Sequence, residues 1–181
     1  QCGIPRQELF LTPKAWVSNA GYEKAKASIE VSLNNLKTDY LDLLLIHIHQ
    51  PFGDYYGTYR AMEQAVRAGK ACAIGVSNFY PDRWLDLFHF CEIKPAVNQI
   101  ETHAFQQQKT AHALMKKYGI QLESWWPFAE EKKRYVYKRN TENNWRPLWQ
   151  NCRIDGSALP RAKRRGCHSQ ICKKRTHERE F

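Results

Sequence analysis

The 181-residue chain lacks a membrane-spanning apolar run, a secretory leader and a repeated cysteine spacing. Its longest apolar run, residues 41–48, is interrupted by Asp42 and His47 and is shorter than the roughly 18 residues that a membrane-spanning helix needs. The first residue is Gln1, and no charged stretch leads into an apolar one near it. We therefore expect a soluble, cytoplasmic protein whose sequence is cut at its front.

The six cysteines show no framework spacing, which argues against a disulfide-stabilised secreted domain. Free thiols in a reducing compartment are the expectation. Cys167, His168 and Cys172 lie close together in sequence, but no second matching pair accompanies them, so we predict no metal site. The cysteines are Cys2, Cys72, Cys91, Cys152, Cys167 and Cys172.

The net charge of +10 is concentrated near one end of the chain. Residues 130–181 carry a net charge of +9, whereas residues 1–129 carry +1. Beyond residue 130 no helical or strand periodicity is present, and charged residues separate isolated apolar ones. These features predict one nearly neutral domain over residues 1–130 and a disordered or irregular basic tail over residues 131–181.

Short apolar runs alternate with longer amphipathic stretches before residue 130, which is typical of repeated βα units around a parallel sheet. Strands are expected at residues 9–12, 43–46, 72–76, 96–100 and 121–125. The stretches between them have apolar residues three and four apart, and Gly69 and Gly119 stand where helices would end. Among these helix residues are Ala25, Ile29, Leu33 and Leu36, then Met62, Ala65 and Val66, then Trp84, Leu87 and Phe88, then Ala111, Leu114 and Met115.

Polar and aromatic residues follow each predicted strand, and ligands of parallel α/β proteins gather at the carboxyl ends of strands. A single Lys or His at a strand end is more often structural than catalytic, but five successive strands ending in this way favour a functional site. The residues concerned are Lys14, Trp16, His47, His49, Ser77, Asn78, Gln99, Glu101, His103 and Trp125.

Seven sequence motifs resemble those of the aldo-keto reductases, in the same order and at similar spacing. They are GIPRQELF (3–10), TPKAW (12–16), DYLDL (39–43), IHQPFGD (48–54), IGVSNF (74–79), PAVNQIETH (95–103) and ESWWPF (123–128). The resemblance implies a (β/α)8 TIM barrel, incomplete here because such barrels usually need roughly 250 residues. It also implies transfer of a hydride from NADPH, with NADH as the alternative, to the carbonyl group of a small-molecule aldehyde or ketone.

By this resemblance Lys14 matches the lysine that lowers the pKa of the family's proton-donating tyrosine, since a nearby cation favours the ionised phenol. The histidine that orients the carbonyl is His47 or His49. His47 keeps the count from the start of its strand, whereas His49 keeps the link to Gln50 and Pro51. We favour His47, because a loop absorbs a two-residue insertion more easily than a sheet register does.

The resemblance also implies contacts with the cofactor. Ser77, Asn78 and Gln99 match residues that hydrogen-bond the nicotinamide carboxamide, and Trp125 matches the aromatic residue on which the nicotinamide stacks. Trp16 matches an aromatic residue of the substrate pocket.

Two departures from the family pattern affect the expected activity. The family's Tyr and Asp precede the lysine by about one βα unit, and residues 1–13 contain neither residue type. Loss of a general acid typically lowers the rate by about 10²- to 10⁴-fold, so this polypeptide is expected to be weakly active or inactive. The substrate and the oligomeric state are left open.

The second departure is the tail, which as written lacks the family's last helix and phosphate-binding segment. A shift of one nucleotide after about Lys132 permits strings that resemble both, so we hypothesise a frameshifted translation from that point. A basic segment with Tyr137, Trp145 and Trp149 would otherwise suggest a non-enzymatic remnant that binds polyanions or nucleic acid. An out-of-frame stretch has accidental composition, and we therefore do not expect nucleic-acid binding.

Overall fold

The computed structural model describes residues 3–51, 53–103 and 105–127. Over these ranges the chain forms a five-stranded, all-parallel sheet in which the strands lie in sequence order. The strands are β1 (Lys14–Ala15), β2 (Leu41–Ile46), β3 (Ala71–Ser77), β4 (Val97–Glu101) and β5 (Gln121–Trp125). The helices that connect them are α1 (Tyr22–Leu36), α2 (Tyr55–Arg67), α3 (Pro81–Phe90) and α4 (Lys109–Lys117), and short 3-10 turns span Arg6–Glu8 and Val17–Asn19.

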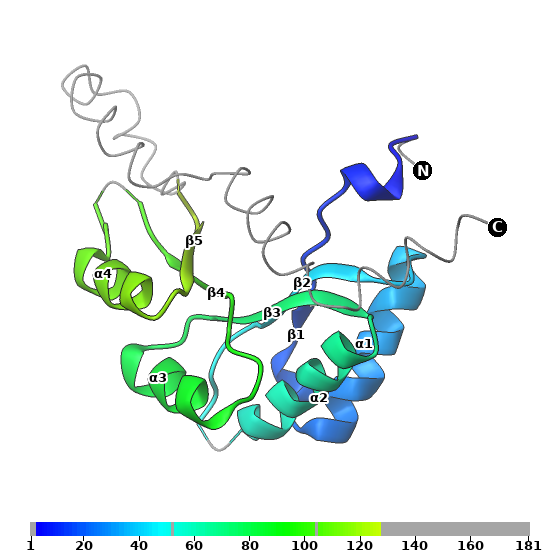
Figure 1. Ribbon diagram of the computed structural model, residues 1–181, viewed down its shortest axis with the longest axis horizontal. Coiled ribbons are helices and arrows are strands. Elements are labelled where there is room, and N and C mark those ends of the chain that lie inside the picture. The colour runs from blue at the N-terminus through cyan, green and yellow to red at the C-terminus, as the bar shows by residue number, and fades with distance from the viewer. Residues whose placement is uncertain (1–2, 52, 104, 128–181) are drawn as a thin grey trace.

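This alternation confirms the parallel α/β sheet that the sequence predicts. Figure 1 shows the strands following one another around a curved sheet, with the helices on its outer side. The expected basic tail lies outside the described residues. In the described part of the chain, no helix is long and apolar enough to cross a membrane.

Four of the five strands form where the sequence predicts them, but the first does not. We expected residues 9–12, and β1 instead comprises Lys14–Ala15. The earlier segment does run beside β2, since Leu11 O accepts from the backbone N–H of Leu43 at 3.3 Å. The N–H of Leu11, however, donates to the side chain of Asp42 at 3.0 Å, and Pro13 has no N–H to donate. A ladder therefore starts only after the proline.

The helices also form as predicted, with one difference. Ala25, Ile29 and Leu33 are buried in α1, whereas Leu36, its last residue, is 42% exposed. Gly69 and Gly119 have φ angles of 71° and 73°, so both adopt the left-handed conformation that ends a helix at low cost.

Two apolar clusters lie on opposite faces of the sheet. The larger one packs helices against the sheet and includes the fully buried side chains of Tyr59, Met62 and Trp84. The smaller one contains Leu43, Leu45 and Val97. Because side chains alternate across a strand, the smaller cluster defines the inner face of the sheet, away from the helices.

Arg6 ties the start of the described chain to the turn between α1 and β2. Its guanidinium donates to Thr38 Oγ1 at 2.8 Å, to Tyr40 O at 2.8 Å and to Asp42 Oδ2 at 2.9 Å. It also lies over the Tyr40 ring, 3.9 Å from the ring centroid. The Asp42 side chain is only 2% exposed, so this ion pair is largely removed from water.

The two cysteines in the described residues, Cys72 and Cys91, form no disulfide. Burial raises the pKa of the Cys91 thiol, which favours the neutral form. This agrees with the expectation of unlinked thiols for these two positions.

Candidate active site

The predicted site residues meet at the carboxyl ends of the strands because the sheet register aligns them. Ser77 lies beside Gln99, Gln99 lies beside Glu123, and Lys14 lies beside Leu45. Gln99 follows Val97 by two positions, and Lys14 is in register with Leu45, so both belong to the inner face of the sheet. Lys14 is level with Leu45, and Gln99 is level with Ser77, nearer the strand ends. The long Lys14 side chain spans this step and donates to Gln99.

A glycine in β3 keeps the strands close below this rim. A Cβ on Gly75 would lie 2.4 Å from the carbonyl oxygen of Val97 and 3.0 Å from the Leu45 side chain. Only a residue without a side chain permits this approach.

Lys14, Gln99 and Glu123 form a continuous hydrogen-bonded chain across three strands. The Lys14 ammonium donates to Gln99 Oε1, and Gln99 Nε2 donates to Glu123 Oε1 at 2.7 Å. Burial lowers the pKa of Lys14, and the negative charge of Glu123 acts in the opposite direction. Glu123 was not among our predicted site residues. The period of two in β5, which places it on the same face as Trp125, could have identified it.

Asn78 connects the ends of three strands. Its side-chain Nδ2 donates to His47 O at 3.3 Å and to Ser77 Oγ at 3.1 Å, while its Oδ1 accepts from the Trp125 indole N–H at 2.7 Å. Asn78 has a φ of 57°, a left-handed conformation that Asn tolerates better than most residues. Ser77 is fully buried and is joined to the rim through Asn78.

His47 belongs to this group. Its backbone N–H donates to Ala15 O at 3.1 Å, and its ring centroid lies 4.3 Å from that of Trp16. Its Nδ1 is buried and, among the described residues, has no hydrogen-bond partner. Burial and, to a lesser extent, the positive charge of Lys14 lower the pKa of His47, so a neutral imidazole is favoured at neutral pH.

His49 occupies a different environment. Its ring packs edge-on against Tyr55, at a centroid distance of 5.0 Å, and against Phe79, at 5.8 Å. Burial and the nearby Arg83 lower the pKa of its imidazole. The two histidines on either side of Ile48 are therefore separated: His47 contacts Trp16, and His49 packs against Tyr55 at the start of α2.

The charge coupling between Lys14 and His47 gives a testable difference between the histidines. Replacing Lys14 by Met removes a positive charge, so we expect the pKa of His47 to rise and that of His49 to stay unchanged. Two-dimensional NMR titration of the imidazole resonances measures both values in one sample. A parallel shift of both histidines would show that the substitution acts through the fold and not through local charge.

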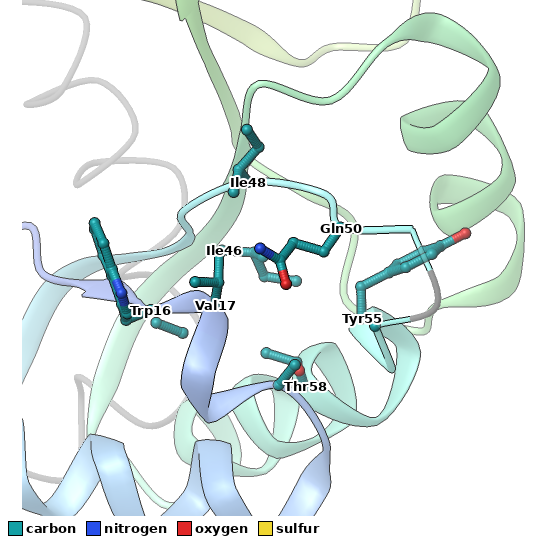
Figure 2. Close-up of a pocket in the computed structure, with 10 residues that line it drawn as sticks. Trp16, Val17, Ile46, Ile48, Gln50, Tyr55 and Thr58 are labelled. Atoms are coloured by element: carbon teal, nitrogen blue, oxygen red, sulfur yellow. The ribbon is translucent and has the colours of Figure 1, made fainter.

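A small pocket lies beside the rim, and Figure 2 shows its labelled side chains. Trp16, Ile48 and Tyr55 surround it, with Thr58 below and the Gln50 side chain between them. Ile46, which also lines it, belongs to the core between helices and sheet, so the pocket is on the helix side of β2. Trp16 is 54% exposed and borders both this pocket and His47.

Seven of the ten predicted strand-end residues thus belong to one connected region or border it, and His49 packs apart from them. Glu101 and His103 form a pair of their own, with His103 Nε2 3.1 Å from Glu101 Oε1. The Phe105 N–H donates to His103 Nδ1 at 3.2 Å, so Nε2 carries the proton shared with Glu101. No group of three or more potential metal ligands occurs in residues 3–51, 53–103 and 105–127.

Comparison with protein families gives a match to the aldo/keto reductase family over residues 3–163. The matched range runs past residue 130, where we expected the resemblance to end, and the domain boundary stays a prediction. Among curated proteins, the glyoxal reductase of Bacillus subtilis is 46% identical over 131 residues, which are 72% of this chain and 47% of that protein. The chain spans about half the length of the curated relatives it matches.

Solved structures agree with this relationship. An aldo-keto reductase from a Medee basin deep-sea metagenome library matches with a TM-score of 0.66 and 44% identity, covering 67% of this chain and 45% of the other. The Bombyx mori aldo-keto reductase in complex with NADP matches with a TM-score of 0.69 and 30% identity, covering 81% of this chain and 52% of the other.

Proposed function

Since the chain belongs to the aldo/keto reductase family, we propose that its strand-end rim is the cofactor half of a site that reduces aldehydes or ketones with NADPH. The observation that carries this proposal is the connected group of Lys14, Gln99, Asn78, His47 and Trp125 at the carboxyl ends of adjacent strands. NADH is the alternative cofactor. Similar proteins crystallised with NADPH or NADP support NADPH as the cofactor.

The residues present suit a nicotinamide. Trp125 offers an indole face, and its ring plane is fixed because its N–H is bonded to Asn78. Gln99 retains one amide N–H, and the amide oxygens of Asn78 and Gln99 each retain acceptor capacity beyond their present bonds, so together they could pair with a carboxamide. A bound NADPH would supply the hydride. The chain's own residues would hold the ring, orient the carbonyl group and set the local charge.

His47 is our proposed carbonyl-orienting residue. Burial and the charge of Lys14 favour its neutral imidazole, which has one N–H and can donate one hydrogen bond to a carbonyl oxygen. The contact with Trp16 places an apolar wall beside it, which supports the assignment of Trp16 to the substrate pocket. His49, packed against Tyr55 and Phe79, is the weaker candidate.

We further propose that the protein acts in the cytoplasm. We also propose that the 181-residue polypeptide by itself catalyses carbonyl reduction slowly. Residues 1–13 include no tyrosine, so the proton donor that the family pairs with Lys14 is not among them. In the described part of the chain, the recorded hydrogen bond of the Lys14 ammonium is with Gln99. Loss of a general acid lowers the rate by about 10²- to 10⁴-fold.

Cofactor binding can be tested without turnover. We expect NADPH at low micromolar concentration to quench the tryptophan fluorescence, because Trp125 would lie against the nicotinamide. The contrasting function, polyanion binding by the basic tail, predicts salt-sensitive retention on heparin and no quenching. Absence of quenching at millimolar NADPH would remove the case for a working cofactor site.

A further inference from the structure

Three side chains from three strands form a hydrogen-bonded chain at the rim. Lys14 on β1 and Glu123 on β5 do not contact each other directly, since Gln99 on β4 lies between them. Gln99 and Glu123 are register partners in the parallel pair β4–β5. The backbone therefore keeps the carboxylate beside the amide.

The orientation of the Gln99 amide follows from its two neighbours. An ammonium has only donors, and an ionised carboxylate has only acceptors. The observed orientation gives each neighbour the end of the amide that it needs. The flipped orientation would place Oε1 against the carboxylate and the NH2 group against the ammonium, which are two repulsive contacts.

We propose that Glu123 is a positioning residue that holds the Lys14 ammonium at the rim through the side-chain amide of Gln99. The proposal rests on the proposed function, in which Lys14 assists proton transfer and Gln99 faces the nicotinamide. A carboxylate at one end of the amide polarises it and makes Oε1 a stronger acceptor for the ammonium at the other end.

This role opposes the effect of burial. Burial favours the neutral amine of Lys14, and the negative charge of Glu123 favours the ammonium. A neutral lysine would neither stabilise an ionised phenol nor fix the Gln99 amide. Glu123 therefore favours the charged form of Lys14, and by accepting one N–H of Gln99 it leaves the second for the rim.

The test replaces Glu123 by Gln, which preserves shape and can still accept from Gln99. Competitive acetylation of lysine amines, read peptide by peptide by mass spectrometry across the alkaline pH range, reports the charge state of Lys14. We expect the E123Q variant to label Lys14 several-fold faster below the wild-type midpoint, because the amine loses its proton at lower pH. Glu92→Gln is the matched control, since Glu92 pairs with the exposed Arg67.

A second variant covers the case in which E123Q folds poorly. Gln99→Leu keeps a similar volume and removes the bridge, so it should also speed the labelling of Lys14. The labelling of Lys70, which pairs with Glu30, should stay unchanged. Unchanged Lys14 labelling in either folded variant overturns the proposal. Failure of NADPH to bind the wild-type chain contradicts the proposed cofactor site but leaves the labelling result intact, so the two failures are distinguishable.

Discussion

Replacing Arg6 by Met is expected to lower the free energy of unfolding by about 3–5 kcal/mol, the usual cost of removing one partner from a buried ion pair. The guanidinium holds Thr38, Tyr40 and Asp42 together, and Asp42 is almost fully buried. Without it, the Asp42 carboxylate keeps the Leu11 N–H but loses its cation. A domain typically has only about 5–15 kcal/mol of stability, so this is a large fraction.

Urea unfolding followed by tryptophan fluorescence measures the change, provided that the slope with denaturant is the same in both proteins. Arg67→Met is the matched control. Arg67 pairs with Glu92, but their side chains are 52% and 81% exposed, and exposed pairs contribute about 0–1 kcal/mol. Equal destabilisation by the two substitutions would mean that the Arg6 cluster is no stronger than a surface ion pair.

The fold was largely predictable, because periodicity reports which side chains face the core. The alternation of strand and helix patterns predicted β2 to β5 to within two residues, whereas the prediction for β1 was wrong for a local reason. The backbone N–H of Leu11 donates to the Asp42 side chain, and Pro13 has no backbone N–H, so this apolar segment beside β2 does not pair as a strand. Hydropathy does not report where a backbone donor is used.

The candidate site was predictable at the level of residues but not of contacts. Parallel strands end at one rim, so Lys14, Gln99 and Trp125 could be grouped in advance. Glu123 lies in the middle of β5, where a glutamate is ordinarily interpreted as solvent-facing, and the β4–β5 register shows that it meets Gln99. The sequence did not separate the two histidines, because side chains two residues apart point to the same side of a strand. The structure gives them different neighbours, Trp16 for His47 and Tyr55 for His49.

Replacing Trp125 by Ala is expected to weaken NADPH binding by roughly 5- to 150-fold, since stacking of a flat ring on an aromatic side chain contributes about 1–3 kcal/mol. Trp125→Phe keeps an aromatic face but loses the N–H that bonds Asn78, so a smaller loss is expected. Phe90→Ala is the control, because Phe90 lies on α3 and is 67% exposed. Isothermal titration calorimetry is the appropriate measurement, as removing a tryptophan alters the quenching signal itself. Wild-type affinity in the alanine variant would show that the nicotinamide does not stack on Trp125, whereas a loss confined to the alanine and phenylalanine variants would support this rim as the cofactor platform.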